Sequence, residues 1–403
     1  IQNQLQQAVD NNLAAYTEKS SEGVYSMQGA ATCVDNSTGN VVAIVGSRSQ
    51  EDIKGYVLNR AYQSYRQPGS CIKPLNVYTP YLQLGNTPDT KVTDSQIDGG
   101  PANADASYAG EMTLTDAVKW SKNTVAWNIY QQITPKTGSS FLIKMGFHKI
   151  WVDKDYNAGA LGGFTYGVTT EEMAGGYAAL ANDGVYRKAT CIRLIVNASN
   201  KTVVNETNRD SKVYDKSASR MMTQMLREVV LSGTGTSANV ENAVVAGKTG
   251  TTNASKDVWF CGYSKYYTTT VWAGYDYPKE MSGVNSRVNA IFKDFMTAVH
   301  TNLPVTDFST VTQQTTQPET TAAVQEETES LPQETTAIVP ETTGIEQVTP
   351  QQVPSTTAQV PTTTPYQRWT TAPAQPKTTA PMQYGDIDAT TRTDPDATAR
   401  GEW

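Results

Sequence analysis

The sequence is poor in the residues that several common kinds of active site require. It contains two histidines and four cysteines in 403 residues, so a histidine-dependent hydrolase triad would have to use His148 or His300. Neither histidine has neighbours typical of a catalytic base, and a packed or solvated side chain is the preferred interpretation. The cysteines have no C-x-x-C spacing, so we expect no metal, no other cofactor and no disulfide framework.

Long apolar runs and clusters of positive charge are also missing. No window approaches the ~18 apolar residues that a membrane helix needs, and no run of Lys or Arg suggests nucleic-acid binding. The chain starts at Ile1 without a methionine or a signal-like segment, which is typical of a fragment or a processed chain. We therefore predict neither a nucleic-acid partner nor a membrane span here.

The negative charge is concentrated in the last quarter of the chain. From Asp307 to Trp403 the composition is dominated by Thr, Pro, Gln and Ala, with repeats such as Pro-Glu-Thr-Thr. This segment holds 13 acidic and 4 basic residues, a net charge of minus 9, so the total of minus 7 leaves plus 2 for residues 1–306. Such a composition buries too little apolar surface to offset its conformational entropy. We expect a disordered tail over residues 307–403.

Apolar periodicity organises the rest of the chain. Apolar residues recur every four positions from Ile1 to Leu13, which predicts a linker helix within residues 1–24. Beyond it, apolar runs predict a hairpin, then helices, then strands again. The hairpin is expected at 28–35 and 41–46, helices at 114–130 and 170–181, and later strands at 243–246, 258–263 and 268–275. This order predicts an α/β (α+β) domain over residues 25–306, with a sheet assembled from distant segments and packed against helices.

Ser70 and Lys73 form the first element that can carry chemistry. A Gly-containing loop enters a helical stretch here, and three residues is nearly one helical turn, so both side chains share a face. A serine becomes nucleophilic when a neighbouring base accepts its proton, and a lysine can serve if burial or another cation lowers its pKa. Two fixed positions recur easily by chance, but this is the single S-x-x-K in 403 residues and two further elements follow it.

The second and third elements add polar and charged groups. Ser121 and Asn123 offer a hydroxyl for proton relay and an amide for binding a peptide. The run from Gly247 to Thr252 follows an apolar segment, which suits an edge strand whose glycines let a substrate backbone approach. Lys248 in this run would add positive charge near Lys73 and attract a substrate carboxylate, with hydroxyl donors at Thr249 and Thr251.

Both of these elements have a competitor elsewhere in the chain. Ser237-Ala238-Asn239 repeats the spacing of the second element, but it lies in a polar, Gly-rich loop with no amphipathic helix after it. Lys136-Thr137-Gly138 repeats part of the third element, but Ser residues follow it and no strand does. We interpret the second competitor as a helix-ending turn and prefer the elements at 121–123 and 248–250.

These elements, in this order, resemble the transpeptidase half of class A (bifunctional) penicillin-binding proteins. The likeness extends over about residues 25 to 280. Further phrases that carry it are Gln28-Gly29-Ala30, Ala160-Leu161-Gly162-Gly163, Ala181-Asn182-Asp183-Gly184, Gly233-Thr234-Gly235, Asp257-Val258-Trp259-Phe260 and Val271-Trp272-Ala273-Gly274-Tyr275-Asp276. The resemblance implies the penicillin-recognising serine transferase fold, in which a five-stranded antiparallel sheet is flanked by helices and joined by a helical subdomain.

The resemblance also implies catalytic roles. Ser70 would attack the penultimate D-Ala carbonyl of a donor stem peptide, and Lys73 would accept its proton. Ser121 would pass a proton to the leaving D-Ala. The acyl-enzyme would then be transferred to an amine of a neighbouring stem peptide, which makes the implied activity a D,D-transpeptidase that cross-links peptidoglycan.

Binding roles are implied in the same way. Asn123 would hold the substrate amide, and Lys248, Thr249 and Thr251 would bind the terminal carboxylate. The backbone N–H groups of Ser70 and Thr251 would form the oxyanion hole. The implied partners are peptidoglycan stem peptides ending in D-Ala-D-Ala, and β-lactam antibiotics as covalent inhibitors.

The family further implies an extracytoplasmic location on a bacterial cell membrane. We expect the anchor and a glycosyltransferase domain to belong to a parent protein, because neither is recognisable in this chain. Two alternatives stay open: a D,D-carboxypeptidase that uses water as acceptor, and a non-catalytic β-lactam sensor module. A class A β-lactamase is disfavoured, since no E-x-x-x-N element follows Asn123 and Glu171-Glu172 looks helical.

Overall fold

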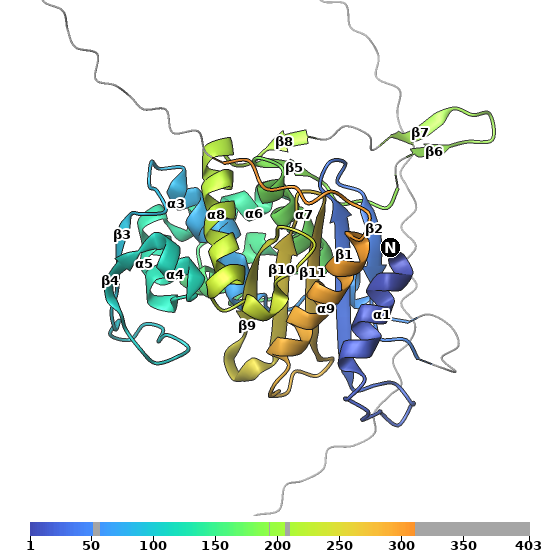
Figure 1. The fold of residues 1–403 in the computed structure, drawn as a ribbon, viewed down its shortest axis with the longest axis horizontal. Helices are drawn as coiled ribbons and strands as arrows, with labels where there is room; N and C mark the ends of the chain where they lie inside the picture. The colour runs from blue at the N-terminus through green and yellow to red at the C-terminus, as the bar shows by residue number, and fades with distance from the viewer. Residues whose placement is uncertain (51–56, 193, 206–209, 311–403) are drawn as a thin grey trace, which may run out of the picture. The chain divides into compact units, whose positions relative to one another are not determined.

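A five-stranded antiparallel sheet forms the centre of the protein, as the family resemblance implies (Figure 1). The computed structural model describes residues 1–50, 57–192, 194–205 and 210–310. The strand order is β2-β1-β11-β10-β9. The strands are β1 (Met27–Asp35), β2 (Val41–Val45), β9 (Ala246–Thr251), β10 (Asp257–Tyr263) and β11 (Tyr267–Tyr275). The predicted N-terminal hairpin therefore pairs with the last strand, and β9 forms one edge.

Side chains alternate between the two faces of this sheet, as an extended backbone requires. On β10, Val258 and Phe260 belong to one hydrophobic cluster, whereas Trp259, Cys261 and Tyr263 belong to another. Each of these five side chains is at most 1 % exposed. Both faces are thus buried, and helices cover each of them.

The helices α1 (Gln2–Leu13) and α9 (Asn285–Val299) cover one face of the sheet (Figure 1). Leu5, Val9 and Leu13 of the predicted apolar stripe are fully buried, whereas Ile1 is 46 % exposed. Burying a Leu or Val side chain contributes about 1.5–3 kcal/mol relative to leaving it in water. The segment predicted as a linker helix is therefore part of the hydrophobic cluster that α9 shares with the sheet.

On the other face, α7 (Thr170–Ala181) packs against β1 and β11. Its predicted bounds are confirmed. A capping box between Thr169 and Glu172 starts the helix, and it ends where Asp183 and Gly184 have φ values of 53° and 88°. The long helix α8 (Lys216–Ser232) lies beside α7 and contacts β9.

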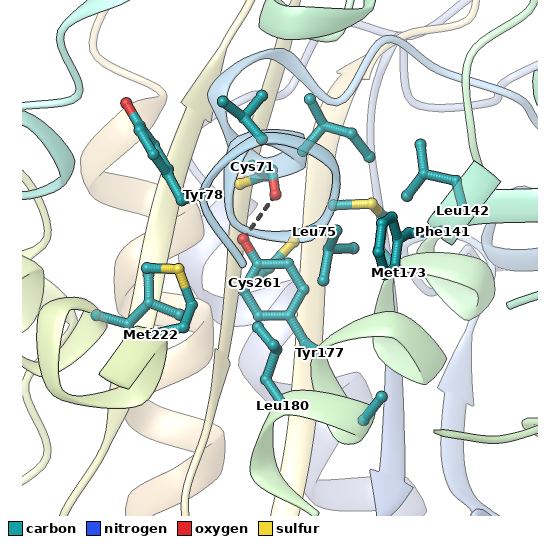
Figure 2. Close-up of a cluster of buried hydrophobic side chains, with 14 of the residues drawn as sticks. Cys71, Leu75, Tyr78, Phe141, Leu142, Met173, Tyr177, Leu180, Met222 and Cys261 are labelled. Atoms are coloured by element: carbon teal, nitrogen blue, oxygen red, sulfur yellow. Dashed lines mark hydrogen bonds between the residues drawn. The ribbon is translucent and has the colours of Figure 1, made fainter. Parts of the chain in front are cut away.

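The segment that carries Ser70 crosses this second hydrophobic cluster. It consists of the 3₁₀ turn η1 (Gly69–Ile72), the π-helical turn η2 (Pro74–Tyr78) and α3 (Thr79–Leu82). Figure 2 shows Cys71 and Leu75 of this segment among side chains from α7 and the sheet. The Tyr177 hydroxyl donates a hydrogen bond to the carbonyl oxygen of Cys71 at 2.6 Å. The backbone next to the predicted nucleophile is therefore fixed by core packing.

The prediction of one helix over residues 114–130 is wrong. The structure has α4 (Leu114–Lys119) and α5 (Asn123–Ile133), separated by a turn in which Ser121 has a φ of 58°. A non-glycine residue seldom adopts this conformation, and apolar periodicity cannot reveal it. The strand predicted at 243–246 is also displaced, because β9 starts at Ala246 and carries the Lys-Thr-Gly triplet itself.

Shorter elements surround this framework. The remaining helical segments are α2 (Arg60–Gln63), α6 (Pro135–Lys144), η3 (Ile150–Asp153), η4 (Asn157–Leu161), η5 (Thr236–Ala238) and η6 (Asn253–Ser255). Three two-stranded sheets pair β3 (Lys91–Asp94) with β4 (Gly110–Thr113), β5 (Val185–Arg187) with β8 (Asp210–Lys212), and β6 (Leu194–Val196) with β7 (Thr202–Asn205). In the described ranges, no helix has the length and apolar character needed to cross a bilayer.

The start of the predicted tail touches the domain. Asp307 accepts a hydrogen bond from Arg227 at 3.1 Å, and the ring of Phe308 lies edge-on to Tyr263 with centroids 5.5 Å apart. These contacts link the first residues after the predicted boundary at residue 306 to the domain. The rest of the predicted tail, residues 311–403, lies outside the described residues.

Candidate active site

Ser70 lies where its loop touches the edge strand β9. Gly69 has a φ of 51°, and a Cβ atom there would lie 2.7 Å from the carbonyl oxygen of Thr251. Gly250 on β9 is equally confined, since a Cβ atom there would lie 2.4 Å from the carbonyl oxygen of Pro68. These two glycines allow the backbones to approach, and Ser70 is consequently placed beside the third predicted element.

Lys73 contacts the second predicted element. Its side chain is fully buried, and Nζ donates hydrogen bonds to the carbonyl oxygen of Ser121 at 2.9 Å and to Oδ1 of Asn123 at 2.7 Å. A neutral amine has two N–H donors and one lone pair. The carbonyl oxygen of Lys122 lies farther away, at 3.5 Å. The two shorter contacts would use both donors of the neutral amine and leave its lone pair to accept a proton, which is what a general base requires.

An ion-pair cluster holds the turn at Ser121. The next residue, Lys122, is 5 % exposed, and its Nζ lies 3.3 Å from Asp94 Oδ2 and 3.1 Å from Asp105 Oδ2. The backbone strain of a residue such as Ser121 costs about 1–3 kcal/mol and persists where the surroundings over-determine it. Here a buried charge pair on the adjacent residue supplies that restraint.

Asn103 caps the helix that follows this turn. Its Oδ1 accepts hydrogen bonds from the backbone N–H groups of Asn123 at 2.7 Å and Thr124 at 3.3 Å, as a helix N-cap side chain does. Its Nδ2 donates to Asp94 Oδ1 at 2.6 Å. The sequence reasoning missed Asn103 and Asp94, because they lie 20 or more residues from the helix that they support.

Lys248 brings a second amine into the site. It is fully buried on β9, and Nζ donates hydrogen bonds to Oγ of Ser121 at 2.8 Å and to the carbonyl oxygen of Thr249 at 3.0 Å. Ser121 thus accepts from Lys73 through its carbonyl and from Lys248 through its hydroxyl. Further along the strand, the hydroxyl of Thr249 lies 2.7 Å from that of Thr234.

Burial changes the proton affinity of both amines. Burial, followed by the positive charge of Lys248, holds the pKa of Lys73 well below its ordinary value of 10.5. Burial also lowers the pKa of Lys248 to about 8. At neutral pH, Lys248 therefore remains mostly charged, and the lowered pKa of Lys73 makes its neutral form accessible.

Two cavities meet at the nucleophile. The larger has a volume of about 710 Å³ and is lined by Ser70, Ser121 and Thr249, among others. The second, of about 490 Å³, shares Ser70, and it continues past Trp127 and Asp257. Asn123 and Thr251 line both. The hydroxyl of Thr251 also donates to Asn285 Oδ1 at 3.1 Å. All seven predicted site residues are thus gathered around one point.

The competing residues lie elsewhere. Ser237 accepts a hydrogen bond from Asn289 at 2.8 Å. The triplet Lys136-Thr137-Gly138 opens α6, with Thr134 as its N-cap. Its interpretation as a helix-ending turn is wrong, because Pro135 suits the first position of a helix. Neither Ser237 nor the triplet is among the described residues that line the two cavities at Ser70.

The histidines are engaged in local contacts, as expected. Nδ1 of His148 lies 2.9 Å from Oε1 of Glu172. The buried ring of His300 contacts the carbonyl oxygen of Met296 at 2.7 Å and the hydroxyl of Ser264 at 2.8 Å. In the part of the chain that the structure describes, no group of three or more His, Cys, Asp or Glu side chains is placed to hold a metal ion.

The arrangement of Ser70, Lys73 and Lys248 defines a class of protein. A serine at a tight turn, a buried lysine with a lowered pKa and a second cation on an edge strand are the parts of a serine acyl-transfer site. A model of the penicillin-binding protein transpeptidase domain matches residues 29–297. The chain belongs to this family, and its predicted fold class is confirmed.

Relatives and solved structures agree with that assignment. Penicillin-binding protein 1A of Clostridium acetobutylicum is 33 % identical over 326 residues, which cover 76 % of this chain and 40 % of that protein. Penicillin-binding protein 1F of Bacillus subtilis is 35 % identical over 283 residues, 67 % of this chain and 38 % of that one. The chain therefore spans about two-fifths of the length of these curated relatives.

Among solved structures, penicillin-binding protein 1A from Haemophilus influenzae superimposes with a TM-score of 0.60 at 25 % identity, covering 71 % of this chain and 49 % of that one. The PonA1 protein from Mycobacterium tuberculosis in complex with penicillin V gives a TM-score of 0.63 at 22 % identity, over 77 % and 86 % of the two chains. The second likeness shows the fold alone.

Proposed function

We propose that this chain cross-links peptidoglycan as a D,D-transpeptidase through an acyl-enzyme on Ser70. One observation carries the proposal. Ser121 accepts hydrogen bonds from Lys73 at 2.9 Å and Lys248 at 2.8 Å, in a cavity that Ser70 also lines. A nucleophile, a base, a proton relay and a cation are thereby joined, which acyl transfer at a peptide carbonyl requires.

The proposed reaction has two steps. Ser70 Oγ attacks the penultimate D-Ala carbonyl of a donor stem peptide while Lys73 accepts the hydroxyl proton, and the N–H groups of Ser70 and Thr251 stabilise the oxyanion. The C–N bond then breaks, Ser121 delivers its hydroxyl proton to the departing D-Ala amine, and Lys73 passes the proton taken from Ser70 on to Ser121. In the second step an amine of an acceptor stem peptide attacks the ester, the C–O bond to Ser70 breaks, and the proton lost by the amine passes to Ser70 Oγ.

The remaining predicted residues would bind the donor. Asn123 Nδ2 donates to the carbonyl oxygen of Ala102 at 2.9 Å, and it would exchange this partner for a carbonyl of the stem peptide. Thr249 and Thr251 line the same cavity, and Nζ of Lys248 donates to Ser121, which also lines it. These three residues would hold the terminal carboxylate. A β-lactam would occupy the donor site and leave Ser70 acylated. We place this activity at the extracytoplasmic face of a bacterial membrane.

Intact-protein mass spectrometry after incubation with benzylpenicillin tests the nucleophile. The wild-type chain should gain the mass of one drug molecule, and Ser70→Ala should gain none. Absence of an adduct on a wild-type chain that circular dichroism shows to be folded would overturn the proposal.

A product assay then separates the acceptors. The protein is incubated with a stem pentapeptide ending in D-Ala-D-Ala, with and without a second peptide that offers a free amine. Formation of the cross-linked dimer supports transpeptidation, whereas release of D-Ala with water as the sole acceptor would replace it with the D,D-carboxypeptidase alternative.

A further inference from the structure

A third cavity, of about 520 Å³, lies apart from the catalytic ones, where α2, η3 and the start of α7 meet. Four aromatic side chains line this cavity, which we call the aromatic groove: Tyr62, Tyr65, Trp151 and Tyr166. Trp151 is 64 % exposed, Tyr62 58 % and Tyr166 52 %. Several large aromatic faces gathered in one exposed hollow are typical of a binding surface, because folding normally removes such area from water.

The walls of the aromatic groove are tied together by specific hydrogen bonds. The Thr170 hydroxyl donates to the carbonyl oxygen of Ala61 at 3.1 Å, which connects α7 to α2. Glu172 accepts from the backbone N–H groups of His148 at 2.7 Å and Thr169 at 2.9 Å, which connects α7 to the segment before η3. The helix α2, the start of α7 and the segment before η3 are therefore held in fixed relative positions.

The charges in the aromatic groove disfavour an ionic ligand. Nζ of Lys149 lies 5.5 Å from the ring centroid of Tyr65 and 5.3 Å from that of Tyr166, so an internal cation already uses one face of each ring, although Tyr166 is still 52 % exposed. Anions gain little at the start of α7, because the Thr169 hydroxyl already accepts from the N–H of Glu172 and the Glu172 carboxylate accepts from the N–H of Thr169. Glu171, which lines the aromatic groove, balances the charge of Lys149. A neutral, polar ligand fits this balance.

We propose that the aromatic groove binds a neutral oligosaccharide, and specifically the glycan strand that carries the stem peptides. The C–H faces of pyranose rings stack on aromatic side chains, and their hydroxyl and acetamido groups can bond to Glu171 and to the Tyr hydroxyls. This substrate assignment rests on the proposed function. Tyr65 precedes Ser70 by five residues, so their Cα atoms are at most ~18 Å apart, and a bound strand would present its peptides close to the nucleophile.

Titration with chitotetraose, followed by saturation-transfer NMR on the full chain, tests the proposal. Wild-type protein should bind the sugar, and Trp151→Ala and Tyr166→Ala should each weaken binding about tenfold, since an aromatic contact contributes on that scale. Tyr277→Ala is the matched control, because Tyr277 is 92 % exposed and does not line the aromatic groove. It should bind like the wild type.

Acylation by benzylpenicillin is measured on the same samples and separates the two proposals. Trp151→Ala and Tyr166→Ala should be acylated at the wild-type rate, which also shows that they are folded. If the wild-type protein reacts with benzylpenicillin but does not bind chitotetraose, the oligosaccharide site is overturned and the proposed transpeptidase activity stands. Equal binding of chitotetraose by all variants would have the same meaning. If the wild-type protein binds chitotetraose but is not acylated, the proposed transpeptidase activity is overturned and the aromatic groove remains a sugar-binding site.

Discussion

The chain contains the triplet Lys-Thr-Gly at two places, and the two copies have different surroundings. At residues 248–250 the triplet is part of edge strand β9, and Lys248 is fully buried against Ser121. At residues 136–138 it forms the first turn of α6, and Lys136 is exposed. The difference shows that the same three residues contribute a buried cation to the active site only when they belong to a strand of the central sheet.

Backbone geometry explains why one copy can serve the site. In a strand, alternate residues share a face, so Lys248 and Gly250 both face the segment of Ser70, where the Cβ-free Gly250 lets Pro68 approach. In a helix, residues three or four apart share a face. The lysine and glycine of the copy at 136–138 consequently point in different directions.

Removing each lysine gives the largest expected contrast. Lys248→Ala should lower the rate of acylation by benzylpenicillin about 10²–10³-fold, as loss of a polar group that stabilises developing charge does. Lys136→Ala should leave the rate unchanged, because its side chain lies in solvent. Time-resolved mass spectrometry measures both rates. Equal rates of acylation in Lys248→Ala and Lys136→Ala would contradict the assignment of Lys248, and not Lys136, to the active site.

Replacing each glycine should separate packing from catalysis. A Cβ atom at position 250 would lie 2.4 Å from the Pro68 carbonyl, and one at position 138 would lie 2.3 Å from the ring of Tyr130. Both Gly→Ala variants should lose about 1–3 kcal/mol of unfolding free energy through overpacking. Gly250→Ala should also slow acylation about 10²-fold, because it displaces β9 from Ser70.

Urea denaturation and acylation kinetics provide the two readouts. If Gly138→Ala slowed acylation as much as Gly250→Ala at equal loss of stability, the effect would belong to general destabilisation, and the special role of the β9 glycine would be rejected.

The pH dependence of acylation should report both buried amines. The rate should fall about tenfold per unit on the acid side, as Lys73 becomes protonated, and fall again above about 8, as Lys248 loses its proton. In Lys248→Ala the alkaline fall should disappear, and the acid fall should move to higher pH because the repulsion that lowers the pKa of Lys73 is gone. An unchanged profile in this variant would contradict the assignment.

Stability should follow the same titration. Both lysines have a lower pKa in the folded state than the ordinary value of 10.5. As the pH rises, the folded protein therefore loses these protons at a lower pH than the unfolded chain does. Unfolding free energy contributed by Lys248 should rise between about pH 8 and 10.5. Comparing urea midpoints of the wild type and Lys248→Ala across this window measures the contribution.

The smallest contrast concerns the threonines. The hydroxyl of Thr249 lies 2.7 Å from that of Thr234 beside the catalytic cavity, whereas that of Thr137 lies 3.0 Å from Thr134 at a helix start. Thr249→Val should slow acylation about two- to tenfold, the scale of one hydrogen bond, and Thr137→Val should leave acylation unchanged. The same kinetic assay distinguishes them.

Some elements could be predicted because their signals are local. Helix α7 carries its own start and stop residues, and its bounds at Thr170 and Ala181 match the prediction. Strands β10 and β11 were predicted to within one residue at their starts, because they are apolar runs bounded by polar turns. The break at Ser121 could not be predicted, since Asp94 at the end of β3 and Asn103 in the following loop act on it from 20 or more residues away.

By itself, the sequence determined the chemistry that this protein offers, because the spacing of Ser70 and Lys73 and the order of the later motifs are properties of the chain. The tertiary structure alone decided how the groups of these motifs titrate. Burial beside Lys248 lowers the pKa of Lys73, and that environment is built by segments far apart in sequence. The aromatic groove has the same origin, because Tyr62, Trp151 and Tyr166 meet only after folding.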